Sequence, residues 1–450
     1  MPSDYSNQAI SYKDPAGFVR KKDGIFYRYI NHSYANEYLH LINSGLYQKL
    51  INEKLLIEHS EVENTDDFYK VILPKQLYFL SYPPEWTFVQ WQEMLHTLLT
   101  INSIALQHGM ILKDASPYNF AFVEGKCLLL DTISFRFYNN GEPWFAYRQF
   151  CEEVLAPMAL IYFKSAYWAK LSFSSVSGFQ LSFVSKQLPL KTWFNSTCLL
   201  HIHLHSKFVS NKSGNKAVSY FNTEKLLNLF NTIDKNVAAW QKPIQEHSIW
   251  DNYYSENIES FTYLQNKENV IRGWLQLLKP SSVVDFGANT GRFSTIASEY
   301  CNHVAAVESD IACIADIISQ KQDNITTFVA DITEPTPGLG WDNTEKIPLL
   351  ERLSGEMILF LAVIHHIAIA KNVPLPLIAS LANKLTTNYV ITEFVPKSDN
   401  KVKQLLRSKE DFFSNYSENH FINCFSEYFS LIEVHQCEDS ERKLFLWQKK

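Results

Sequence analysis

The sequence predicts a two-domain α/β protein whose C-terminal part is a doubly wound, mostly parallel sheet. The chain has 450 residues, whereas one domain usually takes about 100–200 residues. After Pro280, short apolar runs alternate with helical runs at the spacing of βαβ units, which implies a parallel sheet covered on both faces. The pattern changes at Pro280, so we expect a separate domain in the N-terminal part.

The composition excludes several classes of protein. Hydrophobic residues make up 46% of the chain and charged residues 20%, which excludes a disordered chain. The 41 basic and 47 acidic residues leave a net charge of −6, so we do not expect nucleic acid as a partner. Seven cysteines without a C-x-x-C pair indicate a reducing compartment with neither a disulfide framework nor a zinc knuckle, and we expect no metal site. The N-terminus is polar and no run reaches the ~18 apolar residues of a spanning helix, so we expect a cytoplasmic protein without membrane contact.

Two helical segments flank the expected domain boundary. Residues 222–241 carry apolar side chains at helical spacing and stop before Pro243. Residues 268–278 form a second helical segment that stops before Pro280. We therefore place the boundary between these segments, which gives domains at residues 1–245 and 246–450.

The second domain begins with three strand–helix steps and ends with two consecutive strands. The last strand follows another strand without a helix between them, so it should run antiparallel to it. The expected strands lie at residues 282–288, 303–308, 325–332, 357–362, 389–395, 430–436 and 442–448, and the expected helices at residues 292–301, 311–322, 375–385 and 410–429.

A glycine-containing turn joins the first strand of this domain to its first helix. Gly287 and Gly291 frame the turn, and glycines there let a ligand approach the backbone closely. Asn289 occupies the middle place, so the turn is neither a dinucleotide G-x-G-x-x-G loop nor a P-loop. Asp285 at the strand end favours a ligand with an ammonium group and hydroxyls, because it would repel a pyrophosphate.

The next two strands also end in carboxylates. Glu308 ends the second strand, where a doubly wound nucleotide fold places an acid that binds ribose hydroxyls. Asp331 ends the third strand, where it can accept a hydrogen bond from an adenine amino group. Each acid alone could be an ordinary polar strand end. The ordered set predicts a nucleoside-binding site.

Residues 283–450 resemble the class I S-adenosylmethionine-dependent methyltransferases. The resemblance rests on DFGANTGRFS at residues 285–294 and on LAVIHH at residues 361–366, which is similar to the segment after the fourth strand in small-molecule members. It implies a Rossmann-like fold and S-adenosylmethionine as cofactor. The implied cofactor contacts are Asp285 and Gly287 near the methionine part, Glu308 at the ribose, Asp331 at adenine, and Asn289, Gly291 and Ala362 along the loops.

More of the chain resembles a narrower group, the nodulation-protein-like methyltransferases of bacteria. The similar segments are spread over most of the chain and comprise LSYPPEW at 80–86, HGMILKDAS at 108–116, EPWFAYRQF at 142–150 and EFVPK at 393–397. The group's substrates are poorly defined. The name implies no role in nodulation.

Three side chains are candidates for chemistry at the methyl acceptor, namely His365, His366 and Glu393. A histidine after the fourth strand can act as a base near neutral pH without a large change of its pKa. The alternative is that one histidine caps the next helix and the other packs in the core. An Asn/Asp-Pro-Pro-Tyr motif after this strand would indicate amine methylation, and the sequence lacks one.

The first domain resembles the protein-kinase-like and aminoglycoside-phosphotransferase-like folds. Asp114 and Asn119 have the spacing of the catalytic loop, and Asp131 follows a strand–turn–strand as the metal-binding acid does. Upstream, residues 71–74 and 77–82 would be paired strands before a helix at 87–107. Lys70 could be the phosphate-binding lysine, but a glycine-rich loop is missing. The resemblance therefore implies the kinase-like α+β shape more than phosphoryl transfer.

Three further patterns have competing interpretations. His201, His203 and His205 would share one face of a strand, as metal ligands do, but would scatter around a helix. The aromatic segment at 250–254 could be a lid over the cofactor or a hydrophobic anchor. The basic residues at 401–409 are interpreted as a solvated helix face.

The sequence therefore predicts transfer of the methyl group of S-adenosylmethionine to a small-molecule or carbohydrate-like acceptor. One alternative is a phosphotransferase in the N-terminal domain with the methyltransferase fold as accessory. Others are methylation of a protein or RNA, or a binding protein in which both domains have lost activity. The sequence predicts neither the acceptor nor the oligomeric state.

Overall fold

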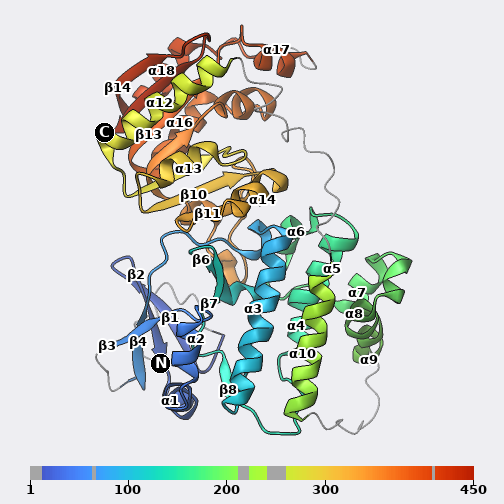
Figure 1. The fold of residues 1–450 in the computed structure, drawn as a ribbon. Helices are drawn as coiled ribbons and strands as arrows, with labels where there is room; N and C mark the ends of the chain where they lie inside the picture. Colours follow the sequence, from blue (N-terminus) through green and yellow to red (C-terminus); the bar gives the residue numbers. More distant parts are fainter. Residues whose placement is uncertain (1–12, 63–66, 211–221, 241–259, 408–410) are drawn as a thin grey trace. The chain divides into compact units, whose positions relative to one another are not determined.

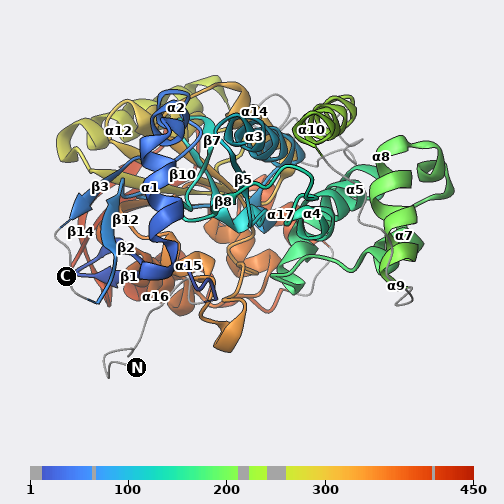
Figure 2. The same ribbon diagram turned by 90° about the horizontal axis from the view of Figure 1, so that it is seen from below.

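The computed structural model of the chain describes residues 13–62, 67–210, 222–240, 260–407 and 411–450. The chain divides into two compact units, which Figures 1 and 2 show from two directions. Unit 1 comprises residues 1–245 together with residues 337–347, and unit 2 comprises residues 246–336 and 348–450. The sequence did not predict that residues 337–347 belong to unit 1.

Unit 1 begins with a four-stranded antiparallel sheet in the order β1-β2-β4-β3. The strands are β1 (Gly17–Lys22), β2 (Ile25–Ile30), β3 (His59–Val62) and β4 (Lys70–Pro74), and the helices α1 (Ala35–Asn43) and α2 (Leu46–Asn52) lie between β2 and β3 in the chain. Tyr38 of α1 packs with Ile30 and Ile72 of the sheet, so α1 covers one of its faces. The expected pairing of residues 71–74 with 77–82 is wrong, because β2 and β3 occupy both edges of β4.

The long helix α3 (Phe88–Gln107) follows, as predicted for residues 87–107. Thr87 begins it with a capping box, since its hydroxyl accepts the backbone N–H of Gln90 while the Gln90 side chain accepts that of Thr87. Two short antiparallel strand pairs come next. They are β5 (Met110–Leu112) with β8 (Phe135–Phe137), and β6 (Phe120–Val123) with β7 (Lys126–Leu129).

The described residues of unit 1 between 147 and 238 are mainly helical. The helices there are α4 (Tyr147–Phe150), α5 (Ala156–Phe163), α6 (Trp168–Leu171), α7 (Leu181–Gln187), α8 (Ser196–Cys198), α9 (His205–Ser210) and α10 (Thr223–Ala238). Short 3₁₀ or π turns are η1 (His32–Tyr34), η2 (Pro83–Glu85), η3 (Pro117–Asn119), η4 (Cys151–Leu155), η5 (Ser172–Ser174), η6 (Leu190–Phe194) and η7 (Leu199–Leu204). Helix α10 confirms the amphipathic helix expected at 222–241.

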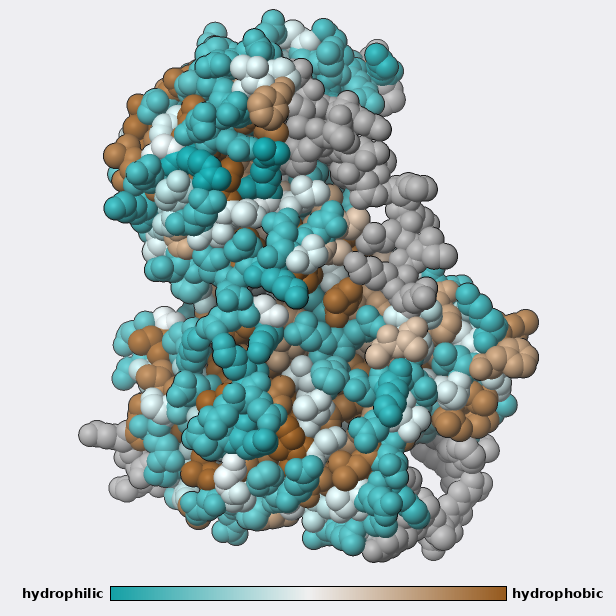
Figure 3. All heavy atoms as spheres, in the orientation of Figure 1, coloured by the Kyte–Doolittle hydropathy of each residue, from teal (hydrophilic) through white to brown (hydrophobic). Residues whose placement is uncertain are grey.

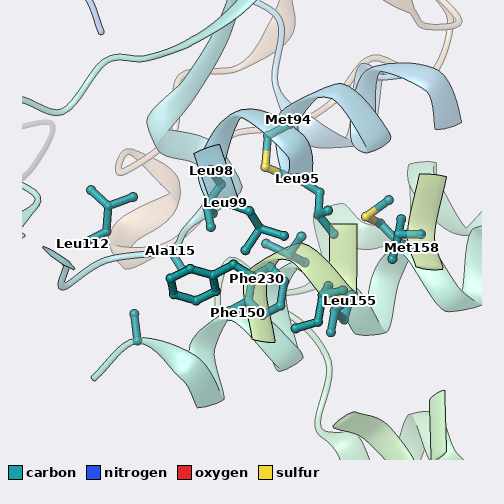
Figure 4. Close-up of a cluster of buried hydrophobic side chains, with 14 of the residues drawn as sticks. Met94, Leu95, Leu98, Leu99, Leu112, Ala115, Phe150, Leu155, Met158 and Phe230 are labelled. Carbon is teal, nitrogen blue, oxygen red and sulfur yellow. The ribbon is translucent and has the colours of Figure 1, made fainter. Parts of the chain in front are cut away.

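The core of unit 1 lies between α3 and the helices after residue 146. Figure 4 shows Met94, Leu95 and Leu98 of α3 facing Phe230 of α10 and Phe150 of α4. Burial of such side chains contributes roughly 1.5–3 kcal/mol each. Gln92 ties the two long helices further, because its amide donates hydrogen bonds to the carbonyl oxygens of Val237 and Trp240 at 2.9 Å.

We term residues 337–347 the strap. They interrupt the sequence of unit 2 and pack within unit 1. Leu339 is buried against Tyr82 and Tyr118. The backbones of Leu339 and Lys346 bond to each other, and η8 (Trp341–Asn343) forms the tip of this turn. The Lys346 ammonium lies 4.9 Å from the Tyr118 ring centroid. The strap is therefore part of the fold of unit 1.

Unit 2 contains a seven-stranded sheet in the order β11-β10-β9-β12-β13-β15-β14. Its strands are β9 (Ser282–Phe286), β10 (His303–Glu308), β11 (Ile325–Val329), β12 (Gly355–Phe360), β13 (Thr386–Phe394), β14 (Phe429–Gln436) and β15 (Lys443–Lys449). The first five strands pair in parallel, and β15 runs antiparallel to both β13 and β14. This confirms the predicted sheet and its antiparallel last strand.

Helices cover both faces of this sheet. The helices are α12 (Phe261–Leu278), α13 (Arg292–Ser298), α14 (Ile311–Ser319), α15 (Leu349–Arg352), α16 (Leu375–Leu385), α17 (Asn400–Leu406) and α18 (Glu418–Ser426), with a π turn η9 (His366–Ala370). Side chains of α12 and α13 pack with Val304, and those of α14 pack with Ala306. Because alternate strand residues share a face, these three helices cover the same face, while α16 contacts α18 and the strands β12 and β13.

The sheet order fixes where a ligand can bind. The chain proceeds from β9 to β10 and β11 on one side, and then returns to β12 on the other side. Ligands of doubly wound sheets bind at this switch point, outside the carboxyl ends of the strands. Hydrophilic side chains cover most of the surface in Figure 3. Among the described residues, no helix has both the length and the apolar character needed to cross a bilayer.

Candidate active site

The turn after β9 holds three residues in the left-handed backbone region. Gly287, Asn289 and Gly291 have φ values of 72°, 49° and 83°. Asparagine is among the few non-glycine residues that tolerate this region, which explains why it can stand in the middle place. A Cβ on Gly291 would lie 2.6 Å from Cγ1 of Ile317, so glycine is needed for α14 to approach the turn.

Glu308 at the end of β10 fixes the conformation of this turn. Its Oε2 accepts the backbone N–H of Asn289 at 3.0 Å, and its Oε1 accepts those of Ser309 and Asp310. The carboxylate is half-buried and faces the cavity described below. Each carboxylate oxygen can accept more than one hydrogen bond, so ribose hydroxyls can still donate to it.

Asp285 and Asp331 differ in their electrostatic environments. Asp285 is buried and accepts a hydrogen bond from the Ser294 hydroxyl at 2.7 Å, and burial raises its pKa to about 6. Burial alone would also raise the pKa of Asp331, but hydrogen bonds from Lys371 and Thr333 hold it below its usual value. Asp331 is therefore ionised at neutral pH. The pKa of Asp285, by contrast, lies close to neutral pH.

A cavity of about 590 Å³ opens where these residues meet. Its volume is in the usual range of small-molecule sites, ~300–1,000 Å³. It is lined by residues from the three strand ends, from the segment after β12, and from α12 and α17, together with Arg442. The lining includes the predicted residues Asp285, Gly287, Asn289, Glu308, Asp331, Ala362 and His366, and the unpredicted residues Tyr263, Lys267, Lys401, Gln404 and Arg442.

Glu393 lies behind this lining, where it holds two side chains of α12. It is fully buried on β13, its Oε2 lies 2.5 Å from Nζ of Lys267, and its Oε1 accepts a hydrogen bond from the Tyr263 hydroxyl. Burial would raise the pKa of Glu393, but Lys267 and Arg442 outweigh burial and lower it. Glu393 is therefore an ionised anchor for Lys267 and Tyr263 and is not among the residues that line the cavity.

Arg442 and Lys401 add positive charge to the lining of the cavity. The Arg442 Nε lies 2.8 Å from Asp399 Oδ2, and its Nη1 donates to the Tyr263 hydroxyl at 3.2 Å. Lys401 lies in the first turn of α17, and burial together with the charge of Arg442 lowers its pKa. The interpretation of residues 401–409 as a solvated face therefore fails for Lys401, although Lys403 is exposed as expected. We term Lys267, Lys401 and Arg442 the cationic wall.

The two histidines after β12 have different positions. His365 is fully buried, neither ring nitrogen has a hydrogen-bond partner, and burial holds its pKa well below the usual value. His366 lines the cavity, and burial and the charges of Lys401 and Arg442 lower its pKa to about 4. The expectation of an unshifted pKa is wrong for both histidines. Of the three residues proposed for catalysis, only His366 faces the cavity.

In unit 1, Asp114 and Asn119 lie together as their spacing predicts. The Asn119 amide donates to Asp114 Oδ2 at 2.9 Å, and the Gln149 amide donates to Oδ1 at 2.7 Å. Asp131 is buried and pairs with Arg28 of β2, with Nη1 2.5 Å from Oδ1. Arg28 was not predicted, because it is far from Asp131 in sequence.

Two other sequence expectations have definite outcomes. Lys70 pairs with Glu61 on the neighbouring strand at 2.7 Å and not with a predicted site residue. His201, His203 and His205 lie on the helical elements η7 and α9, so the strand interpretation is wrong. His201 bonds to Tyr147, and His203 bonds to Ser185 and Thr192. The proposed lid at 250–254 lies outside the described residues.

Comparison with known sequences gives one relative of nearly the same length. The chain is 26% identical over 464 residues to the nodulation protein NoeA of Rhizobium meliloti (strain 1021), covering 98% of this chain and 96% of the relative. No family model matches the chain.

Solved structures similar to part of the chain include several methyltransferases. The N-methyltransferase NodS from Bradyrhizobium japonicum WM9 is 11% identical with a TM-score of 0.32, covering 43% of this chain and 99% of its own. The magnesium protoporphyrin IX methyltransferase ChlM from Synechocystis PCC 6803, with bound S-adenosylhomocysteine, is 12% identical with a TM-score of 0.30, covering 58% and 98%.

Proposed function

We propose that unit 2 is a methyltransferase that uses S-adenosylmethionine and acts on a small-molecule or carbohydrate-like acceptor. The observation that carries the proposal is the cavity at the switch point, to which consecutive strand ends contribute Asp285, Glu308 and Asp331 in order. A dinucleotide is disfavoured because Asp285 lies beside the glycine turn, where it would repel a pyrophosphate.

The residues of the cavity match the parts of this cofactor. The cofactor has an ammonium and a carboxylate at its methionine end, ribose hydroxyls in the middle and an adenine amino group at the other end. Asp285 accepts hydrogen bonds from the ammonium, Glu308 accepts them from the ribose and Asp331 accepts one from adenine. A Cβ on Gly287 would lie 3.1 Å from Cγ2 of Val363, so glycine lets the turn pack closely on the segment after β12 that lines the same cavity.

The cofactor supplies an electrophilic methyl group on a sulfonium. The role of the protein is then to align the acceptor atom with that methyl group and to exclude water from the site. The lining also includes residues of α12 and α17 and Arg442, to which the match with the three strand-end acids assigns no part of the cofactor.

Titration calorimetry with S-adenosylhomocysteine tests the cofactor site. We expect the wild type to bind it and Glu308→Gln to bind it at least about tenfold more weakly, because a hydrogen bond to a charged group contributes ~1.5–3 kcal/mol. Asp316→Asn on the exposed face of α14 is the matched control and should bind normally. Absence of binding by the wild type at millimolar ligand would contradict the proposal.

For unit 1 we infer a kinase-like shape without phosphoryl transfer. The shape is supported by the order of the elements. A sheet with α1 comes first, then a long helix, then a loop with Asp114 and Asn119, and then two short strands before Asp131. The Arg28–Asp131 ion pair opposes activity, because a cation already neutralises the carboxylate that magnesium needs. Calorimetry should detect no magnesium-dependent ATP binding. Binding that Asp131→Asn abolishes would favour the phosphotransferase instead.

A further inference from the structure

The helical part of unit 1 contains a long stretch of sequence with charges of only one sign. Between Glu153 and Glu224 the chain has seven lysines and no aspartate, glutamate or arginine. The whole chain, by contrast, has a net charge of −6. A local field of one sign attracts partners of the opposite charge. This stretch is therefore a basic region of an acidic protein.

Four large apolar side chains on neighbouring elements of this stretch are exposed to solvent. Phe194 and Leu190 of η6 are 94% and 83% exposed, and Phe183 of α7 and Leu200 of η7 are exposed as well. We term these four residues the exposed tip. In Figure 3, hydrophobic side chains gather at the edge of unit 1 where Figure 1 places α7 and α8. Apolar side chains that gather on a surface indicate an interaction site.

A buried histidine holds η6 in the orientation that exposes its two tip residues. His203 of η7 is fully buried, and its ring nitrogens bond to the hydroxyls of Ser185 on α7 and Thr192 on η6, each at 2.8 Å. The Trp193 ring stacks on the same imidazole, with the ring centroids 4.3 Å apart. Because the middle of η6 packs inward on His203, the tip residues at its two ends face solvent. Packing therefore fixes their exposure.

Exposed lysines lie beside the tip. Lys191 stands between the two tip residues of η6, and its ammonium lies 5.8 Å from the ring centroid of Phe163. Lys186 of α7 is exposed as well. Helix α10 contacts α8 and brings Asp234 to this part of unit 1, but Asp234 pairs with His96 of α3. The surface thus combines protruding apolar side chains with positive charge.

The charge of the stretch argues against two other occupants of this surface. In a symmetric dimer the same patch faces itself, which would bring the lysines of one copy against those of the other. Interfaces between proteins are enriched in arginine and depleted in lysine, whereas this stretch contains lysine and no arginine. A bilayer surface with anionic lipids suits both features, because it attracts lysines and accepts apolar side chains below the headgroups.

We propose that the exposed tip and its lysines bind the surface of a bilayer that contains anionic lipids. Leu190 and Phe194 enter the boundary between headgroups and acyl chains, and Lys186 and Lys191 contact the lipid phosphates. We expected no membrane contact because the chain lacks a run long enough to span a bilayer, but binding at the surface needs no such run. The inference concerns unit 1 alone and does not rest on the proposed function of unit 2.

Sedimentation with lipid vesicles tests this inference on the full-length protein. One set of vesicles contains phosphatidylcholine alone, and the other contains equal amounts of phosphatidylcholine and phosphatidylglycerol. We expect the protein to bind the second set at least about a hundredfold more tightly, because each lysine near an anionic surface adds to the affinity. Equal binding to both sets, or binding to neither, would overturn the inference. Equally tight binding to soluble polyglutamate would assign the surface to an acidic protein instead and would also overturn it.

Two pairs of variants test the apolar and the charged part separately. Phe194→Ser should weaken binding to the anionic vesicles about tenfold, because it removes an apolar side chain that the bilayer would bury. Phe412→Ser is its control in unit 2, where Phe412 is 76% exposed, and should bind normally. Lys191→Glu should also weaken binding about tenfold. Lys22→Glu, at the exposed end of β1, changes the net charge equally and should bind much as the wild type does.

Equal effects within either pair of variants would overturn the inference, because the binding would then not depend on this surface. Size-exclusion chromatography over a range of concentrations checks for self-association. We expect the wild type and Phe194→Ser to elute alike. A dimer that Phe194→Ser dissociates would assign the exposed tip to a second copy of the chain and would overturn the proposal.

Discussion

Asp285 combines a structural and a binding role in one buried carboxyl. Its hydrogen bond from Ser294 ties the end of β9 to α13, and its burial raises the pKa to about 6. A ligand ammonium needs the ionised form. The folded pKa lies above the value of an exposed aspartate, so ionisation of this group costs stability as the pH rises through about 6.

The affinity for S-adenosylhomocysteine should therefore depend on pH in a defined direction. We expect constant binding above about pH 7 and weaker binding as the pH falls below about 6, because protons compete with the ammonium for Asp285. Calorimetry between pH 5 and pH 8 measures this dependence, because that range extends roughly one pH unit or more on either side of the pKa. Asp285→Asn should bind weakly and lose this pH dependence. An unchanged dependence in the variant would assign it to another group.

The residues that could be predicted from sequence are those fixed by local patterns. Asp285, Glu308 and Asp331 each end an apolar run, so their place at the sheet edge follows from strand geometry. Lys401 and Arg442 could not be predicted, because they come from separate later segments and meet only through the fold. The change in the histidine pKa values has the same cause, since it depends on these cations and on burial.

At the scale of elements, the turn between β9 and α13 depends on backbone conformations that few residues adopt. Gly291 has a φ of 83°, and the Cβ of any other residue would overlap Ile317 of α14. The helices α13 and α14, which cover the same face of the sheet, therefore meet at Gly291, where there is no side chain. The close packing of α14 on the turn is the structural reason for the glycine.

Gly291→Ala should destabilise the protein by about 1–2 kcal/mol or more, from the left-handed backbone alone. Gly273→Ala is the matched control, because Gly273 lies in α12 with nothing within 4 Å of the added Cβ. That variant should gain roughly 0.5–1 kcal/mol, since alanine is the better helix former. Chemical denaturation monitored by circular dichroism measures both. A Gly291→Ala variant as stable as the wild type would contradict this account of the turn.

Elements with strong periodicity were predictable, and short half-buried strands were not. The βαβ order of unit 2 and the antiparallel β15 follow from apolar runs and their spacing. In unit 1, β1, β2 and β3 were missed because they have few buried residues and mixed polar positions. Their pairing depends on contacts distant in sequence, such as β2 with β4.

At the scale of the whole molecule, the strap means that a single boundary in the sequence does not separate the two units. The chain passes from unit 1 to unit 2 after residue 245, returns at residue 337 and leaves again after residue 347. The strap is anchored in unit 1 by Leu339 and by an ion pair of 2.7 Å between Lys13 and Glu345.

Leu339→Asp should release the strap, because a carboxylate cannot remain buried against Tyr82 and Tyr118 without a partner. Limited proteolysis followed by mass spectrometry should then show new cleavage between residues 337 and 347. Binding of S-adenosylhomocysteine by unit 2 should stay unchanged. Trp341→Ala in the same segment is the control, since Trp341 is 74% exposed. Equal cleavage in both variants would argue against the anchoring role of Leu339.

The strap also has a consequence for synthesis on the ribosome. Domains usually fold as they emerge, the N-terminal one first, at ~5–20 residues per second. Unit 1 lacks Leu339 and Lys346 until residue 347 has emerged, and the intervening residues take roughly 5–20 s to make at that rate. During this delay the Tyr82–Tyr118 cluster is exposed while β9, β10 and β11 are already being made. Unit 1 therefore completes its folding only after about half of unit 2 has been translated.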